Sequence, residues 1–184
     1  MNVFLSPHND DETLFGAFTI LRERPAVYVV FRGDPRSGDP DKRVLETSLA
    51  TRILGARRFV QGAIQQEPAD VNSRTFSHDK VMQIQAMFRE IDEKERPDLV
   101  WAPAMKPCGN AEHVVVGHQA SVVFGPRVVH YHTYYAGQKV VQQDKPVPYE
   151  PPWIRLKHIA LACYETQFEK AGRHFVEDLR EWYA

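Results

Sequence analysis

Short apolar runs alternate with longer segments of helical period along most of this sequence. The apolar run Asn2–Leu5 precedes a helical segment at Asp11–Arg24, and the run Ala26–Phe31 precedes another at Lys42–Leu54. Repeated strand–helix units favour a parallel sheet covered by helices on both faces. The pattern therefore predicts an α/β fold, a three-layer sandwich in which helices flank a mostly parallel sheet.

The elements that follow continue this order. Further strands are predicted at Arg58–Gln61, Leu99–Ala102 and Arg127–Tyr134, and further helices at Ser77–Glu95 and Glu112–Phe124. Residues that commonly end helices, Pro25, Gly55 and Pro97, support these boundaries, and Ser77 is a plausible N-cap. The architecture is of the doubly wound, Rossmann-like type, and a chain of 184 residues suits one domain spanning residues 1–184.

Two C-terminal stretches lie beyond this pattern. Gly137–Pro152 is polar and proline-rich, and we predict a loop or an edge hairpin because only about 30 residues follow it. The last stretch, Trp153–Ala184, is predicted to be helical in two pieces.

Charge, hydropathy and cysteine spacing restrict the partners and the compartment. The sequence has 23 Lys and Arg against 24 Asp and Glu, and this balance argues against nucleic acid as a partner. No apolar run approaches the roughly 20 residues that cross a bilayer, so no integral membrane segment is predicted. Cys108 and Cys163 form no CxxC pair. A reducing, cytoplasmic location is therefore the simplest expectation.

The end of the first predicted strand carries an imidazole and three acidic side chains. His8, Asp10, Asp11 and Glu12 lie where the strand gives way to a helix, and open α/β sheets bind ligands at such strand ends. One imidazole and two carboxylates supply ligands for zinc and leave a carboxylate for acid–base work. The alternative is that the acidic residues simply cap the helix and complement its dipole.

Four segments in order resemble one known family. The segment Ser6-Pro7-His8-Asn9-Asp10-Asp11-Glu12 resembles the PHxDDE signature of the LmbE/PIG-L family of zinc-dependent N-acetylglucosaminyl deacetylases. Three further segments are similar to other motifs of that family: Arg43-x-x-Glu46 with Leu54-Gly55, Asn110-Ala111-Glu112-His113-x-x-x-Gly117, and Lys157-x-x-Ala160-x-x-x-Tyr164-x-x-Gln167.

The resemblance implies a role for each matching residue. It implies that His8, Asp11 and His113 hold Zn²⁺, although the same donors would also accept iron or manganese. Asp10 is then the general base, which activates a water and returns its proton to the leaving amine. Arg43 is implied to bind substrate. The implied reaction removes an acetyl group from an amino sugar, a small-molecule substrate.

One position departs from the family pattern. Asn110 stands where the family usually has a histidine that stabilises the oxyanion, and an Asn amide can donate a hydrogen bond but carries no charge. We therefore expect Asn110 to contact the substrate as a catalytic group of weaker effect. His130 and His132 share one face of a predicted strand and offer a replacement imidazole.

Other residues are weaker candidates. His118 follows His113 by five residues and so points away from the same metal. Cys108 is a soft zinc ligand, and Tyr164 and Gln167 are candidate substrate contacts. Glu46 is expected to pair with Arg43 one turn earlier in the same helix.

Two rival functions follow from the sequence. A nucleotide-binding module lacks support, because no GxGxxG follows the first strand and the acidic residues there would repel a pyrophosphate. A degenerate, non-catalytic zinc- and carbohydrate-binding member of the same family is the stronger alternative, and its motivation is Asn110. The short loops also leave room for a pocket completed by a second subunit, so a homo-oligomer is an open expectation.

Overall fold

The fold is built on a seven-stranded sheet in which the first five strands are parallel. The computed structural model describes residues 1–33, 39–66, 76–105, 110–133, 145–167 and 181–183. The strands are β1 (Asn2–Ser6), β2 (Ala26–Arg32), β3 (Arg58–Gln65), β4 (Leu99–Pro103), β5 (Val128–Tyr131), β6 (Lys145–Pro146) and β7 (Trp182–Tyr183). Their order is β3-β2-β1-β4-β5-β7-β6, and the pairings of β7 with β5 and with β6 are antiparallel. The predicted α/β sandwich with a mostly parallel sheet is confirmed.

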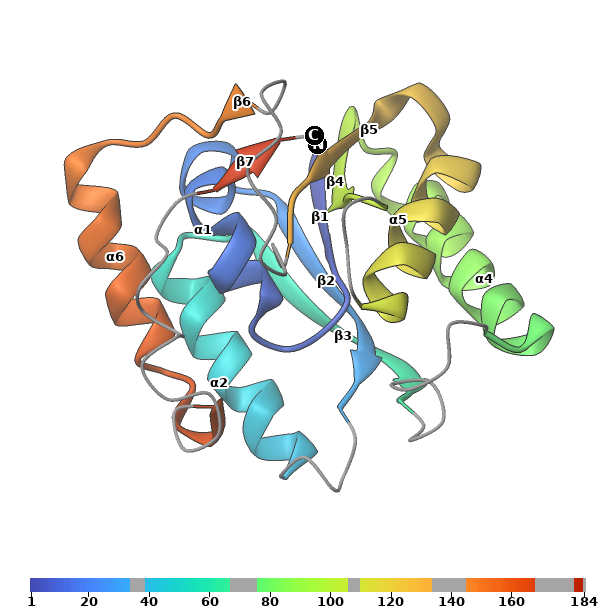
Figure 1. Cartoon of the computed structure of the whole chain (residues 1–184), viewed down its shortest axis with the longest axis horizontal. Helices are drawn as coiled ribbons and strands as arrows, with labels where there is room; N and C mark the ends of the chain where they lie inside the picture. Colours follow the sequence, from blue (N-terminus) through green and yellow to red (C-terminus); the bar gives the residue numbers. More distant parts are fainter. Residues whose placement is uncertain (34–38, 67–75, 106–109, 134–144, 168–180, 184) are drawn as a thin grey trace.

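Helices cover both faces of the sheet (Figure 1). The helices are α1 (Asp11–Glu23), α2 (Pro40–Ile53), α4 (His78–Glu95), α5 (Ala111–Phe124) and α6 (Pro151–Leu161), with a short 3₁₀ turn at Gly125–Arg127. Helices α1, α2 and α6 lie on one face, and α4 and α5 lie on the other. None of the helices in the described ranges combines the length and the apolar character needed to span a bilayer.

Each face of the sheet has its own buried apolar cluster, because successive side chains of a strand point to opposite faces. On β1, Val3 and Leu5 pack toward α4 and α5, whereas Phe4 packs toward α1 and α6. All three are fully buried. The sheet is therefore covered on both sides, and side chains that follow the strands gather at its carboxyl edge.

Most predicted boundaries agree with the structure to within two residues, but three do not. β3 continues to Gln65 rather than ending at Gln61, and β5 ends at Tyr131 rather than at Tyr134. α6 begins at Pro151, two residues before the predicted helical stretch. The prediction that the chain is helical to its end was wrong, because Trp182 and Tyr183 form strand β7. This segment is a strand because Tyr183 pairs with Tyr131 on β5. Such a long-range pairing cannot be predicted from the periodicity of the local sequence. Cys108 and residues 134–144 lie outside the described residues.

Candidate metal centre and active site

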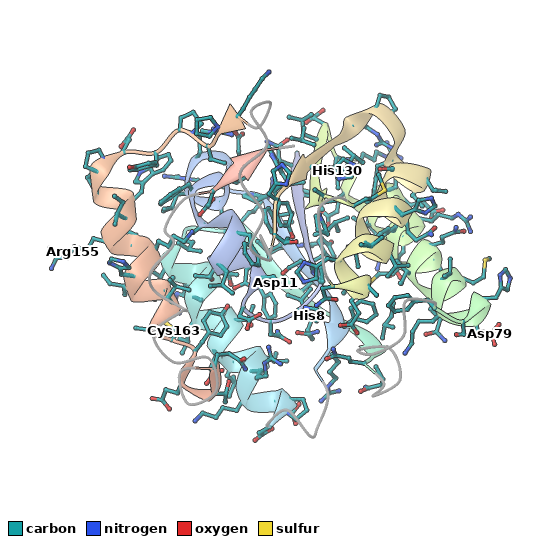
Figure 2. The ribbon with its side chains drawn as sticks, viewed as in Figure 1. His8, Asp11, Asp79, His130, Arg155 and Cys163 are labelled. Atoms are coloured by element: carbon teal, nitrogen blue, oxygen red, sulfur yellow. The ribbon has the colours of Figure 1, made fainter. Side chains whose placement is uncertain are left out.

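The sheet brings the sequence-predicted metal ligands together at its carboxyl edge. β1 and β4 are parallel neighbours, so the residues that follow them emerge side by side. His8 and Asp11 come from the β1–α1 connection, and His113 comes from the first turn of α5, which follows β4. Figure 2 shows His8 and Asp11 close together at the middle of the molecule. Gly117 permits this approach, because a Cβ there would collide with the carbonyl oxygen of Pro103 at the end of β4.

Three ligand atoms lie within reach of a single ion. His8 Nδ1 lies 2.9 Å from Asp11 Oδ2, His113 Nε2 lies 3.0 Å from the same oxygen, and the two ring nitrogens are 3.3 Å apart. Asp11 and His113 are fully buried. The second carboxylate oxygen, Asp11 Oδ1, is buried and has no hydrogen-bond partner among the described residues. Two imidazole nitrogens and one carboxylate fit a divalent metal such as zinc, with a coordination position left open.

The charges at this site are arranged for a cation. Burial opposes the imidazolium, but the charges and hydrogen bonds of Asp11 and Glu112 outweigh it and raise the pKa of His8 to about 10. Burial likewise opposes the Asp11 carboxylate, yet His113 and His8 hold its pKa well below the ordinary range. The metal-free protein therefore keeps a proton on this cluster, and a bound ion would take the place of that proton.

Glu112 contacts the ring nitrogen of His8 that faces away from Asp11, Nε2. Its Oε2 lies 2.5 Å from His8 Nε2 and accepts a second hydrogen bond, 2.8 Å long, from Gln66 Nε2. A carboxylate on the outer nitrogen of a metal-binding histidine fixes the ring and raises its basicity. In the sequence, Glu112 was named as part of the motif that contains His113, without a role of its own. Its place beside His113 was the available signal, but its contact with His8, over a hundred residues away, required the fold.

Asp10 stands beside the metal ligands in an unusual conformation. Its φ is 121° and its ψ is −34°, a region that side-chain-bearing residues rarely adopt and that costs on the order of 1–3 kcal/mol. Asp10 is the N-cap residue of α1, yet its side chain accepts no capping hydrogen bond. The alternative interpretation of Asp10 as a plain helix cap is therefore wrong. Burial and the charge of Asp11 raise the pKa of Asp10 to about 8, although Arg43 and His8 oppose this shift.

Arg43 lies immediately behind the Asp10 segment. Its Nη2 donates to the carbonyl oxygen of Asn9 at 2.6 Å and lies 3.5 Å from Asp10 Oδ2. The side chain is almost wholly buried, so its described contacts are with the protein. The substrate-binding role that the resemblance implies for Arg43 stays a prediction. The expected pairing with Glu46 does not form, because Glu46 instead accepts hydrogen bonds from Thr166 N and Oγ1 at 3.0 and 2.5 Å.

Asn110 caps the helix that carries His113. Its Oδ1 accepts a hydrogen bond of 2.9 Å from Glu112 N, and its backbone is extended. The side-chain oxygen is therefore engaged at the helix start. The amide NH₂ is the part of Asn110 that could serve a substrate, and its catalytic and substrate-binding roles stay predictions.

The other histidines divide into three cases. His118 is exposed on α5, in agreement with the prediction that it points away from the metal cluster. His130 does not supply the missing imidazole, because Nδ1 lies 3.0 Å from the Pro103 carbonyl oxygen and Nε2 lies 3.1 Å from Ser121 Oγ. His132 is buried near the carboxyl end of β5, and its proposed role stays a hypothesis.

Two residues of the C-terminal motif, Lys157 and Tyr164, contact helix α1 next to the candidate site. Lys157 Nζ donates to the carbonyl oxygen of Leu14 at 2.7 Å and to Glu181 Oε1 at 2.8 Å, and Glu181 also accepts from Phe18 N. Tyr164 is fully buried and donates to Glu12. This hydroxyl therefore contacts the protein, in contrast to the substrate contact considered for Tyr164. The sequence analysis grouped Glu12 with the acidic residues at the end of the first strand and did not predict this contact.

The described fold and cluster define a class of protein: a doubly wound α/β protein with a buried His-Asp-His group at the carboxyl edge of its sheet. No family model matches the sequence, and no curated protein sequence matches it significantly. Solved structures do match. The zinc-inhibited form of teicoplanin deacetylase Orf2 aligns with a TM-score of 0.75 at 18% identity, covering 95% of this chain and 87% of that chain.

A second deacetylase and one enzyme of another class share the fold. The N,N'-diacetylchitobiose deacetylase from Pyrococcus horikoshii, complexed with its inhibitor MPG, has a TM-score of 0.67 at 17% identity, covering 95% and 74% of the two chains. The 4-carboxy-2-hydroxymuconate hydratase GalB from Pseudomonas putida KT2440 has a TM-score of 0.64 at 14% identity, covering 99% and 94%. The chain thus has the fold of LmbE/PIG-L-type deacetylases, as the resemblance implied. Because a hydratase shares this fold, the reaction must be argued from the site.

Proposed function

We propose that this protein is a metal-dependent hydrolase that removes the acetyl group from an N-acetylglucosamine-type amino sugar. The observation that carries the proposal is the convergence of His8, Asp11 and His113 on one point. The Asp10 carboxylate lies beside them and makes no capping hydrogen bond to α1. The fold shared with deacetylases of teicoplanin and of N,N'-diacetylchitobiose is consistent with this reaction.

His8, Asp11 and His113 would hold the metal, and Zn²⁺, iron and manganese all suit these donors. When bound, the ion supplies Lewis acidity toward the acetyl carbonyl and lowers the pKa of a water. Glu112 keeps the His8 ring turned so that Nδ1 faces Asp11 and His113. The protein thereby confines the reacting carbonyl and water to the space beside Asp10.

Asp10 performs the proton transfers. Its pKa of about 8 belongs to the metal-free protein, and a cation in the cluster would offset the charge of Asp11 and lower that value. Asp10 is then ionised near neutral pH and can accept the proton of the attacking water. It returns this proton to the departing nitrogen, so that acetate and a free amine leave.

Asn110 is the proposed donor to the oxyanion and to the substrate. Its Oδ1 accepts a hydrogen bond from Glu112 N, and the NH₂ group is the donor that this side chain would offer to the substrate. A neutral donor stabilises an oxyanion less than an imidazolium does, because it brings no net charge. We therefore expect a slower reaction than a charged donor would permit.

A second candidate function is a non-catalytic module that binds metal and carbohydrate. Asn110 favours it, because this position lacks a charged donor beside an otherwise complete ligand set. The two candidates differ in a single measurable respect, the release of acetate.

The test is acetate release from reconstituted protein. Protein stripped with a chelator is reloaded with Zn²⁺, Fe²⁺ or Mn²⁺ and incubated with N-acetylglucosamine and N,N'-diacetylchitobiose, and acetate and free amine are quantified. We expect release that requires a metal and is lost in His113→Ala. His118→Ala is the matched control, because it removes an exposed imidazole from the same helix. Tight metal binding without acetate release from any substrate on a broader panel would favour the binding module instead.

A further inference from the structure

A buried tyrosine contacts Glu12, two residues after the proposed base Asp10. Tyr164 follows α6, is fully buried, and donates its hydroxyl hydrogen to Oε1 of Glu12. Thr13 Oγ1 donates to the same oxygen at 2.7 Å. Glu12 is itself fully buried in the first turn of α1. One carboxylate oxygen of Glu12 is therefore held by a tyrosine that comes from the far end of the chain.

The other oxygen of Glu12 faces Asp10. Glu12 Oε2 accepts a hydrogen bond of 3.0 Å from the backbone N–H of Asp10. The chain of contacts thus runs from the Tyr164 hydroxyl, through both oxygens of the Glu12 carboxylate, to the backbone of Asp10. None of these contacts involves His8, Asp11 or His113.

Asp10 needs such support because its backbone is strained. Its positive φ is a conformation that glycine adopts readily and aspartate does not. The neighbouring groups are held as well: Asp10 O accepts from Thr13 N and Leu14 N at 3.0 and 2.9 Å, and Arg43 holds the carbonyl oxygen of Asn9 at 2.6 Å. The bond to Glu12 restrains the remaining group, the Asp10 N–H.

We infer that Glu12 and Tyr164 are positioning residues that fix the Asp10 backbone and so aim its carboxylate at the substrate. The inference rests on the proposed function of Asp10 as the base. Neither residue touches the reacting atoms, and both act through Asp10. The C-terminal motif that contains Tyr164 thereby belongs to the active site although it lines no part of the metal cluster.

The first experiment compares two isosteric substitutions. Tyr164→Phe removes only the hydroxyl that holds Glu12. Tyr131→Phe is the matched control, because Tyr131 is equally buried, belongs to the same apolar cluster and donates its hydroxyl to the carbonyl oxygen of Leu5 at 2.8 Å. We expect Tyr164→Phe to lower kcat about tenfold or more, with KM and bound metal unchanged, because misdirected catalytic groups lose rate rather than affinity. Tyr131→Phe should leave kcat within about twofold.

A second readout does not depend on activity. Hydrogen exchange of the Asp10 amide, followed by NMR of ¹⁵N-labelled metal-free protein, reports the bond to Glu12 directly. We expect this amide to exchange at least about tenfold faster in Tyr164→Phe than in wild type, and at the wild-type rate in Tyr131→Phe. Glu12→Gln keeps one carbonyl acceptor, so it should retain more kcat and slower Asp10 exchange than Glu12→Ala.

The outcomes separate this inference from the proposed function. Equal effects of the two tyrosine substitutions on kcat and on Asp10 exchange would overturn the inference, because both hydroxyls would then be merely stabilising. Loss of kcat without faster Asp10 exchange would overturn it as well. Faster Asp10 exchange in Tyr164→Phe, in a protein whose wild type releases no acetate, would support the positioning contact and refute the deacetylase proposal.

Discussion

The two helices that supply the candidate site begin in opposite ways. α5 begins conventionally, with Asn110 extended at φ −103° and its side chain capping Glu112 N. α1 begins with Asp10 at φ 121° and no side-chain cap. Both helices follow neighbouring parallel strands and start at the same edge of the sheet. The difference is therefore local to the two helix starts and does not follow from the position of the helices relative to the sheet.

This contrast locates a cost in stability at the start of α1. An N-cap side chain contributes about 1 kcal/mol, and α1 forgoes it while also holding a strained residue. The Asp10 carboxylate thereby makes no capping hydrogen bond and lies beside the candidate metal ligands. At α5 the cap is kept, and the side-chain oxygen of Asn110 accepts a hydrogen bond from Glu112 N. Strain of this kind usually marks a functional position.

The largest expected effect comes from removing the Asp10 carboxylate. Asp10→Asn should lower kcat about 10²–10⁴-fold, as expected for loss of a general base. Asp10→Gly should be as inactive but more stable than wild type by about 1 kcal/mol, because glycine relieves the strain and loses only part of the gain to backbone entropy. Acetate release and chemical denaturation measure the two quantities.

The same variants have a pH signature in metal-free protein. The folded pKa of Asp10 is about 8, well above its ordinary value near 4, so the folded state disfavours the ionised carboxylate. The loss of unfolding free energy caused by the Asp10 carboxyl group is absent below about pH 4 and grows as the pH rises toward 8. The stability advantage of Asp10→Asn over wild type should grow across that interval. An advantage that is constant with pH would contradict the assignment of this shift to Asp10.

A smaller effect is expected at Asn110, with the opposite sign for stability. Asn110→Ala should lower the free energy of unfolding by about 1 kcal/mol, because it removes the cap of α5. Asn110→Asp keeps the capping oxygen and loses the NH₂ donor, so it should unfold like wild type yet release acetate up to about 10²-fold more slowly. Wild-type rates in Asn110→Asp would exclude the amide as a catalytic donor.

The smallest effect is a change in bound protons when metal is added. At pH 7 the metal-free protein holds a proton on His8, whose pKa is about 10, and one on Asp10, whose pKa is about 8. Metal binding requires neutral His8 and favours ionised Asp10, so about one or two protons should leave per ion. Calorimetric titration in buffers of different ionisation enthalpy counts them. Asp10→Asn should release fewer, and Asn110→Asp the same number as wild type.

Much of the fold was predictable because it depends on local periodicity. Buried strands such as Ala26–Arg32 are continuous apolar runs, and the helices between them carry the expected caps and stops, including Ser77, whose side chain accepts from Lys80 N. Strand β7 was not predictable, because two residues become a strand only through their partners on β5 and β6. The early start of α2 was missed because Asp39 and Pro40, its cap and first residue, lie in a stretch that resembles a turn.

The site was predictable to the extent that motifs name residue types. The resemblance brought His8, Asp11 and His113 to attention, and these three do converge. The motifs did not indicate that Asp10 has a strained backbone and makes no capping hydrogen bond, since such strain has no signature in residue composition. The motifs also did not predict the contacts of Glu112 with His8 and of Tyr164 with Glu12. These contacts join residues more than a hundred positions apart.

The buried pair of Lys157 and Glu181 has a consequence for biosynthesis. α1 leaves the ribosome long before Glu181 is made, and a nascent chain that reaches only α6 lacks the carboxylate that Lys157 meets beside Leu14 and Phe18. A buried ammonium deprived of its partner costs about 3–5 kcal/mol. α6 therefore docks firmly on α1 only after the segment around residue 181 has emerged. The contact of Lys157 with α1 therefore acquires its carboxylate partner only after residue 181 has been synthesised.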